Sequence, residues 1–218
     1  FKLKSGVSLY GGFAGTETAK EERKLKADGK KWEWANPTIL SADDEVADKW
    51  IRELDYGSSS RYSWTVTGNE NNFYHCVVAN EELKERTVVD GFTMKGGNAD
   101  YHKPYAGGAA VYAIGWIELS NCIFTENHAK FKSEGTKNFH GGAVTIISAA
   151  GTEGKSKVEN CLFLNNKSSA SYTVSYGGGL YIQKGTVSNC EFVGCVSLDG
   201  GGGLYNDNGT ASQITSTN

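Results

Sequence analysis

The sequence predicts an all-β solenoid, a parallel β-helix in which short repeated units stack on one another. A six-residue motif recurs, in which an apolar residue is followed by two polar or small residues and then by a second apolar pair. It occurs at 119–124, 158–163 and 187–192, and in a degenerate form at 89–94. Gly-rich segments at 107–108, 141–142, 177–179 and 200–203 begin the next units. Because such a unit cannot bury its own apolar face, the units must stack.

The break inside each motif predicts a bend between two short strands. Strand alternation stops for two residues and then resumes, and the second of these is Asn121, Asn160 or Asn189, or Gly91 in the degenerate copy. Asn and Gly are the residues that tolerate a left-handed backbone. We therefore expect the three asparagines to form a ladder. We also expect the phenylalanines three residues further on to stack in the core: Phe124, Phe163 and Phe192.

Composition fits this fold and excludes several functions. The 218 residues include 28 Gly, which suits many tight turns, and only 2 Pro. Few positions therefore lack the backbone N–H that donates hydrogen bonds between strands. The net charge is -3 with scattered Lys and Arg, so the sequence predicts no nucleic-acid partner. No apolar run approaches the roughly 20 residues of a membrane helix, so no membrane span is expected. No cofactor motif is present either, because the Gly-rich stretch near the N-terminus lacks the Lys and Ser/Thr of a phosphate loop.

The cysteines are predicted to be buried thiols. Cys122, Cys161 and Cys190 occupy one inward column, so neighbours lie about 4.8 Å apart with parallel side chains. Parallel Cβ directions place the Cβ atoms beyond the usual ~3.5–4.5 Å of a disulfide. Cys190 and Cys195 have no His nearby and make a poor zinc set, so no metal is expected.

The chain is predicted to be one domain over 1–218, with irregular coils and insertions in 1–72 and regular coils in 73–218. Strands are expected within 6–15, 37–41, 63–67 and 73–79, a helix-permissive segment at 17–34 and an acidic excursion at 43–62. The last unit, 211–216, aligns with 187–192 but is more polar. A second candidate surface in the N-terminal region consists of Trp32, Trp34, Trp50 and Trp64, although tryptophans more often anchor such an insertion to its scaffold.

An ordered series of motifs resembles bacterial right-handed parallel β-helix surface proteins. The segments are 1–18, 35–41, 74–78, 89–99 and the Gly-Gly-Gly-Leu-Tyr units. They are similar to proteins with the pectate-lyase-like fold and to the repeats of chlamydial polymorphic outer-membrane proteins. The resemblance implies a right-handed, single-stranded helix at the cell surface or outside the cell, associated with an outer membrane. It implies no particular activity, because such folds carry many functions.

Three insertions at one corner are the candidate binding surface. They span 98–106, 129–140 and 168–176, and equivalent turns of successive coils lie side by side. Aromatic rings among polar and basic groups suit sugar stacking or a protein partner. The alternative is that these loops pack on the coil wall and shield it. The candidate residues are Tyr101, His102, Tyr105, Phe131, Phe139, His140, Tyr172 and Tyr176.

The carboxylates do not form a recognisable catalytic pair. Glycoside hydrolysis needs two facing carboxylates, whereas the acids here are either in one loop or scattered. Asp43, Asp44 and Glu45 could bind calcium, as in lyases that share the fold the resemblance implies, but a solvated acidic turn is the simpler interpretation. Asp90 lies in the bend column, where a turn-forming role explains it. The other acids considered are Asp48, Glu118, Glu159, Glu191 and Asp207.

The sequence therefore favours a non-catalytic, adhesin-like module of an extracellular or cell-surface protein. Its expected partners are a polysaccharide or a host or cell-surface protein, and no catalytic residue is assigned. The alternative is a polysaccharide lyase or glycoside hydrolase, or an inactive relative, that acts on acidic polysaccharide along the helix wall.

Overall fold

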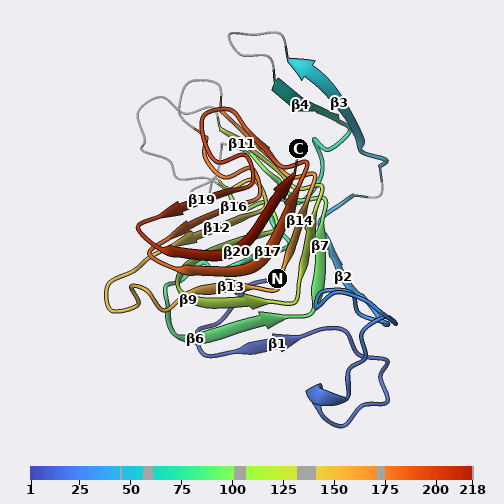
Figure 1. The fold of residues 1–218 in the computed structure, drawn as a ribbon, viewed down its shortest axis with the longest axis vertical. Helices are drawn as coiled ribbons and strands as arrows, with labels where there is room; N and C mark the ends of the chain where they lie inside the picture. The colour runs from blue at the N-terminus through green and yellow to red at the C-terminus, as the bar shows by residue number, and fades with distance from the viewer. Residues whose placement is uncertain (45, 56–60, 101–106, 132–140, 171–174, 218) are drawn as a thin grey trace.

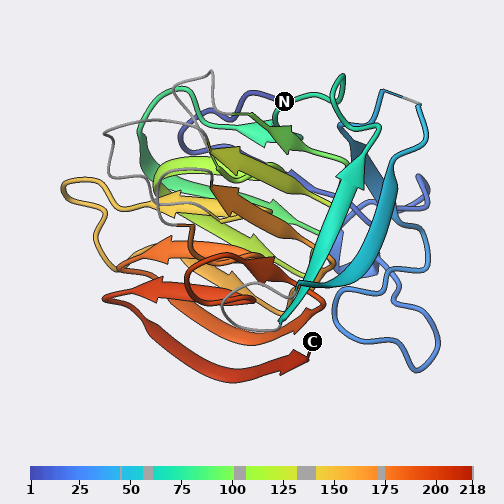
Figure 2. The ribbon, with the colours of Figure 1, turned by 90° about the horizontal axis from the view of Figure 1, so that it is seen from above.

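The chain folds into stacked parallel strands (Figure 1). The computed structural model describes residues 1–44, 46–55, 61–100, 107–131, 141–170 and 175–217. Within these residues, a 14-stranded sheet, a 4-stranded sheet and a 2-stranded hairpin account for the named strands. Every pairing between named strands outside the hairpin is parallel. Units succeed one another from the N-terminal to the C-terminal side (Figure 2), an arrangement compatible with a β-helix.

We describe the strands as four rows, A to D, which the chain visits in that order in each unit. Row A follows the Gly-rich segments and contains β5 (Val77–Val78), the first half of β9 (Val111–Ser120), β12 (Val144–Ile147), β16 (Leu180–Gln183) and β19 (Leu204–Asp207). Row B contains β1 (Ser8–Tyr10), β6 (Leu83–Asp90), the second half of β9, β13 (Lys157–Glu159), and the first halves of β17 (Thr186–Val193) and β20 (Thr210–Thr217).

Rows C and D complete each unit. Row C contains β2 (Thr38–Ser41), β7 (Phe92–Lys95), β10 (Ile123–Thr125), β14 (Leu162–Leu164) and the second halves of β17 and β20. Row D is the 4-stranded sheet of β8 (Asn98–Ala99), β11 (His128–Phe131), β15 (Lys167–Ala170) and β18 (Val196–Ser197).

Glycine is required where the chain passes from row D to row A. At this turn the backbones of successive units touch, and Gly142 N–H donates to the carbonyl of Gly177 at 2.9 Å. A Cβ atom on Gly142 would lie 2.0 Å from the carbonyl oxygen of Gly178, and one on Gly178 would lie 2.3 Å from that of Gly202. The Gly-rich segments of the sequence thus mark the closest approach between units.

The predicted phenylalanine stack is confirmed. Phe124, Phe163 and Phe192 are almost fully buried, and their ring centroids lie 4.8 and 4.6 Å apart, with interplanar angles of 22° and 11°. The column continues in register through Met94 to Leu40 on one side and to Ser216 on the other. The row C interior is therefore one continuous apolar ladder that ends in a polar residue.

The predicted left-handed bends between rows B and C are confirmed, and the asparagine ladder is present in part. Asn189 Nδ2 donates to Oδ1 of Asn160. Asn121 Nδ2 instead donates to Oδ2 of Asp90 at 3.2 Å, as expected for a carboxylate at a bend. A positive φ recurs at the second bend position in each copy: Gly91 84°, Asn121 53°, Asn160 52°, Asn189 50° and Gln213 53°.

A second asparagine ladder, which the sequence analysis did not predict, lies in the interior at the turn from row C to row D. Asn127 and Asn166 are fully buried, and Asn127 Nδ2 donates to Oδ1 of Asn166 at 3.0 Å. Asn166 Nδ2 donates to the carbonyl of Phe124 at 2.8 Å. Cys195 occupies the equivalent place in the next unit and contacts Asn166 Nδ2 through its sulfur at 3.7 Å. The side-chain amides satisfy backbone groups that the turn leaves unpaired.

The cysteine column is buried as predicted. All five cysteines belong to the described residues and are free thiols. Burial raises the pKa of Cys76 to about 12 and that of Cys195 to about 11. Cys76 and Cys195 are therefore protonated at neutral pH and pack as small apolar groups.

The N-terminal region contains a unit that the sequence analysis did not recognise. Leu9 of β1 pairs with Val89, and Leu40 of β2 pairs with Met94, so β1 and β2 are the row B and row C strands of one unit. Residues 12–37 are inserted at its bend. The expected helix-permissive segment holds only the 3-10 turn η1 (Lys20–Glu22).

This insertion is anchored by its tryptophans, as the simpler interpretation expected. Trp32 is buried, and Trp34 Nε1 donates to the carbonyl of Asn121 at 3.0 Å. The Arg23 guanidinium lies 4.4 Å from the Trp34 ring centroid and forms an ion pair with Asp90 at 2.9 Å. The insertion is thus attached to the bend between rows B and C.

A second insertion forms the antiparallel hairpin of β3 (Lys49–Asp55) and β4 (Arg61–Thr67), where the sequence analysis expected an acidic excursion before a single strand. Alternation in both strands allows Trp50 and Trp64 to pack edge to face, with centroids 6.1 Å apart. Trp64 Nε1 donates to the carbonyl of Gly194 at 2.7 Å, and Lys167 donates to the carbonyl of Trp64. The strand predicted over 73–79 is also shorter, since only β5 is formed there.

His128 makes the fold sensitive to acid. Its imidazole is buried beside Trp50, with Nε2 3.0 Å from the Ser169 hydroxyl, and burial, with Lys167 and Lys130 nearby, holds its pKa well below 6.5. As pH falls through 6.5, the unfolded chain binds a proton at His128 that the folded chain does not. We therefore expect the free energy of unfolding to fall by up to about 1.4 kcal/mol per pH unit in this range.

Urea unfolding of the wild type and of His128→Gln, at about pH 7.5 and about pH 5.5, checks this expectation. His128→Gln should reduce the difference in stability between the two conditions, whereas His75→Gln should change it less because His75 is less deeply buried. An unchanged difference in His128→Gln would contradict the assignment.

Candidate functional site

The outer face of row A carries a series of aromatic side chains. Alternate residues of row A point inward, where Val111, Val144 and Leu180 join the core. The residues between them face outward and lie in register across the sheet. This outward column consists of Val78, Tyr112, Thr145, Tyr181 and Tyr205.

Three tyrosine rings stack at the C-terminal end of this column. The centroids of Tyr181 and Tyr205 are 5.7 Å apart and their planes differ by 8°. The rings of Tyr176 and Tyr205 also stack, with centroids 4.4 Å apart and planes that differ by 30°. Tyr181 is buried, whereas Tyr176 and Tyr205 are half-buried and keep ring surface exposed. We call Tyr176, Tyr181 and Tyr205 the tyrosine stack.

A carboxylate orders the polar edge of the tyrosine stack. Asp207 Oδ2 accepts hydrogen bonds from the Tyr181 hydroxyl at 3.3 Å and from Gln183 Nε2 at 3.2 Å. Its Oδ1 accepts a bond of 2.6 Å from Asn208 Nδ2. Burial and the neighbouring Asp207 charge raise the pKa of Tyr181, so its hydroxyl remains protonated. Fixed rings next to an oriented carboxylate and amides can present both apolar area and hydrogen-bonding groups to a ligand.

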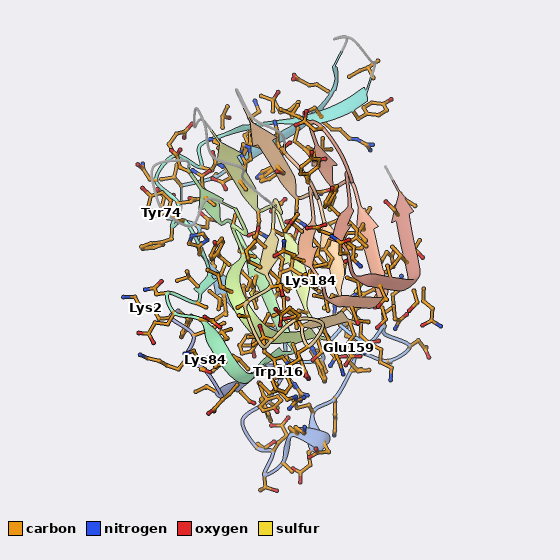
Figure 3. All side chains as sticks on the ribbon, turned by 90° about the vertical axis from the view of Figure 1, so that its left-hand side faces the viewer. Lys2, Tyr74, Lys84, Trp116, Glu159 and Lys184 are labelled. Atoms are coloured by element: carbon orange, nitrogen blue, oxygen red, sulfur yellow. The ribbon has the colours of Figure 1, made fainter. Side chains whose placement is uncertain are left out.

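The other end of the column carries a second aromatic pair. His75 and Tyr112 have ring centroids 6.1 Å apart, and His75 Nδ1 is 3.0 Å from the carbonyl of Gly108. Burial lowers the pKa of His75, so the ring is neutral at pH 7. Tyr74 and Trp116 lie on the same side of the molecule (Figure 3), and the Lys155 ammonium is 4.9 Å from the Trp116 centroid.

Most of the predicted binding residues lie outside the described part of the chain. These are Tyr101, His102, Tyr105, Phe139, His140 and Tyr172. Phe131 ends β11, where only its backbone is described. Tyr176 is described, and it belongs to the tyrosine stack.

The segments that flank the three predicted loops lie side by side. The first residues of the three predicted loops belong to strands, which corrects the predicted starts: β8, β11 and β15 pair with one another in row D. The Gly-rich segments that follow the loops are also adjacent, with Gly108 N–H donating to the carbonyl of Gly141 at 2.8 Å. The loops therefore leave and re-enter one corner of the fold, next to row A.

The acidic residues do not form a second site within the described residues. Glu118 pairs with Arg86 at 2.5 Å, Glu191 pairs with Lys30, and Glu159 is exposed. In the acidic segment, Asp48 Oδ2 accepts a bond of 2.9 Å from Asn72 Nδ2, and burial raises the pKa of Asp48. In the described part of the chain, no three His, Cys, Asp or Glu side chains gather closely enough to hold a metal ion.

The sequence analysis missed Tyr112, Tyr181 and Tyr205 as a group, although a signal was present. Each tyrosine directly follows the apolar residue that ends a Gly-rich segment, in Ala-Val-Tyr or Gly-Leu-Tyr. Its position in the repeat places it on the outer face of row A.

Comparisons with protein-family models, with curated proteins and with solved structures find no match to this chain. In the residues that the structure describes, no helix has the length and apolar character needed to cross a membrane.

Proposed function

We propose that the chain is a right-handed parallel β-helix module of an extracellular or cell-surface protein, and that it binds a glycan through the tyrosine stack and the corner loops beside it. Registered parallel pairing in four rows supports the helix. Its right hand follows from the general preference of parallel connections, which are right-handed in about 98% of cases.

The tyrosine stack is the observation that carries the binding function. Tyr176 and Tyr205 are stacked and partly exposed, and Asp207 accepts bonds from Gln183 and from Tyr181, the third ring of the stack. Sugar rings have apolar C–H faces and peripheral hydroxyls, so they match rings bordered by polar groups. An extended polysaccharide also suits a repeat scaffold, which presents an elongated surface.

A glycan array followed by titration calorimetry tests this proposal. We expect Tyr205→Ala to weaken binding of a glycan found on the array by about 5- to 30-fold, equivalent to the roughly 1–2 kcal/mol of a stacked ring. Tyr62→Ala removes an exposed tyrosine of the β3–β4 hairpin and should leave binding unchanged. Equal binding by both variants would overturn the assignment of the tyrosine stack.

The same glycans should be incubated with the protein and analysed for new reducing ends and unsaturated products. We expect binding without turnover. Turnover would instead favour the lyase or glycoside hydrolase alternative, in which substrate lies along the helix wall.

A further inference from the structure

The tyrosine stack lies beside a carboxylate that has no countercharge. Tyr205 and Asp207 are alternate residues of β19, so both side chains are on the outer face of row A. Within the described residues, Asp207 forms no ion pair, and its hydrogen-bond donors are the neutral side chains of Tyr181, Gln183 and Asn208. A carboxylate offers about four acceptor positions, so these three bonds leave room for one more donor.

A second carboxylate lies near the same rings. Asp199 is exposed, and its Oδ2 accepts a bond of 2.6 Å from the backbone N–H of Ser175, the residue before Tyr176. Gly200, the residue after Asp199, pairs with Tyr176 across the turn. Burial and then Asp207 raise the pKa of Tyr181, and no cation acts against them. The charges beside the tyrosine stack are therefore negative.

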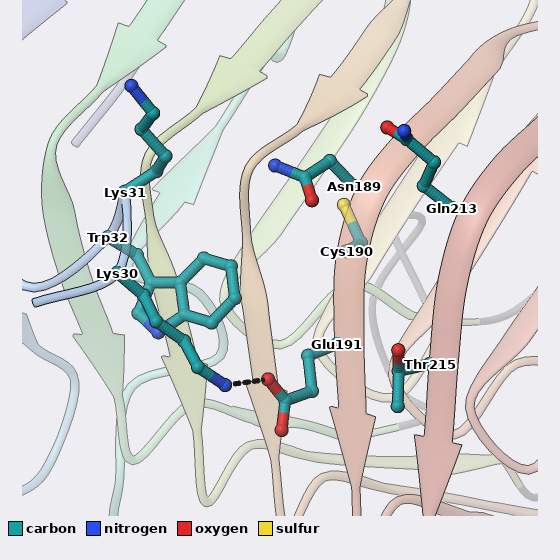
Figure 4. A pocket seen from close by; sticks show the side chains of 8 residues that line it. All are labelled: Lys30, Lys31, Trp32, Asn189, Cys190, Glu191, Gln213 and Thr215. Atoms are coloured by element: carbon teal, nitrogen blue, oxygen red, sulfur yellow. Dashed lines mark hydrogen bonds and ion pairs between the residues drawn. The ribbon is translucent and has the colours of Figure 1, made fainter.

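Elsewhere in this chain a ring and a carboxylate together hold a cation. In the pocket between the 12–37 insertion and strands β17 and β20, the Lys30 ammonium is 5.3 Å from the centroid of Trp32 and forms an ion pair with Glu191 (Figure 4). The negative face of an aromatic ring attracts a positive charge, and a neighbouring carboxylate adds to the attraction.

The Arg23 guanidinium repeats this arrangement, with the Trp34 centroid at 4.4 Å and Asp90 at 2.9 Å. The tyrosine stack has the rings and the carboxylate but not the cation. Within the described residues, no Lys or Arg lies over the ring of Tyr176 or Tyr205. A cationic group of a ligand would complete the arrangement.

We propose that the tyrosine stack recognises glycans that contain 2-amino-2-deoxyhexose residues with a free amino group. The sugar ammonium pairs with Asp207 and lies against the neighbouring Tyr205 ring, whereas an acidic sugar is repelled by Asp199 and Asp207. This inference rests on the glycan binding proposed above, and it adds the charge of the ligand.

Titration calorimetry with β-1,4-linked hexamers of glucosamine and of glucose tests the inference. The two hexamers differ only at C2, which carries an amine in the first and a hydroxyl in the second. At about pH 6.5, below the roughly 7.7–8.0 of an α-amino group, most of the amines are protonated. We expect the glucosamine hexamer to bind about 5- to 30-fold more tightly, equivalent to roughly 1–2 kcal/mol. Equal binding of both hexamers, or binding of neither, would overturn the inference.

The preference of the wild type should also depend on pH and on salt. Raising the pH to about 9 removes the charge of the amines, and raising the ionic strength to about 1 M screens a partly exposed ion pair. Both changes should reduce the preference, and neither measurement needs a variant to fold. A preference that is the same at about pH 6.5 and about pH 9 would show that charge is not recognised.

Asp207→Asn should remove the preference for the glucosamine hexamer, because the amide keeps the shape of the side chain but not its charge. Asp28→Asn is the matched control. Asp28 is an exposed carboxylate of the 12–37 insertion, and its φ of 56° is one that Asn tolerates. Circular dichroism checks that both variants fold. An unchanged preference in folded Asp207→Asn would contradict the role of this carboxylate.

The outcomes separate this inference from the proposed function. If Tyr205→Ala weakens binding of a neutral glycan and the glucosamine hexamer has no advantage, the tyrosine stack binds sugar but does not select an amine. If Tyr205→Ala leaves the binding of every glycan unchanged, the proposed function fails as well.

Discussion

Replacing Phe163 with Ala is expected to lower the free energy of unfolding by about 3–5 kcal/mol. Phe163 is fully buried between the rings of Phe124 and Phe192, with centroids 4.8 and 4.6 Å away. Both neighbours belong to paired strands that fix their positions, so they cannot move in to fill the cavity. Urea unfolding monitored by circular dichroism measures the loss.

Phe73→Ala is the control for this substitution. Phe73 is 70% exposed, so the same chemical change should alter the unfolding free energy by no more than about 0.5 kcal/mol. A loss of less than about 1 kcal/mol in Phe163→Ala would mean that the row C interior relaxes around the deletion and is not a rigid ladder.

The regular units could be predicted because each local signal there has one structural meaning. An Asn or Gly between two apolar positions requires a left-handed bend, and Asn121, Asn160 and Asn189 all adopt it. Strand alternation on both sides of that bend then determines which residues face the core.

The N-terminal unit could not be recognised in this way, because its two strands are far apart in the sequence. Residues 12–37 are inserted between β1 and β2, so no short stretch of sequence contains both halves of the six-residue motif. The apolar partners that reveal the unit, Val89 and Met94, lie in a later part of the chain. Pairing across such distances is set by the stacked scaffold and not by local sequence.

Of the three residues in the tyrosine stack, the sequence analysis named only one as a candidate binding residue. Loop positions followed from repeat spacing, and Tyr176 at the end of one predicted loop belongs to the tyrosine stack. Tyr205 and Tyr181 were missed because strand alternation shows only that a residue faces away from the core. It does not show whether that outer face is exposed to solvent or covered by other segments. The tyrosine pattern is informative only once row A is known to be an outer wall.

Replacing Arg23 with Met is expected to cost about 3–5 kcal/mol, which is far more than a surface ion pair contributes. The Arg23 and Asp90 side chains are only 7% and 14% exposed, and the guanidinium also donates to the carbonyl of Gly11 at 2.8 Å. Asp90 in turn accepts bonds from Ser120 and Asn121 at the bend. Removing the cation leaves this carboxylate without its countercharge in a poorly solvated site.

Arg86→Met provides the matched control. Arg86 also pairs with a carboxylate, that of Glu118, but its side chain is 55% exposed, so its removal should cost no more than about 1 kcal/mol. The double variant Arg23→Met/Asp90→Asn should recover part of the loss, because the uncompensated charge is then absent. Equal losses for Arg23 and Arg86, or strictly additive losses in the double variant, would mean that Arg23 acts by packing on Trp34 alone. The insertion would then be held to the bend by its aromatic anchors and not by charge.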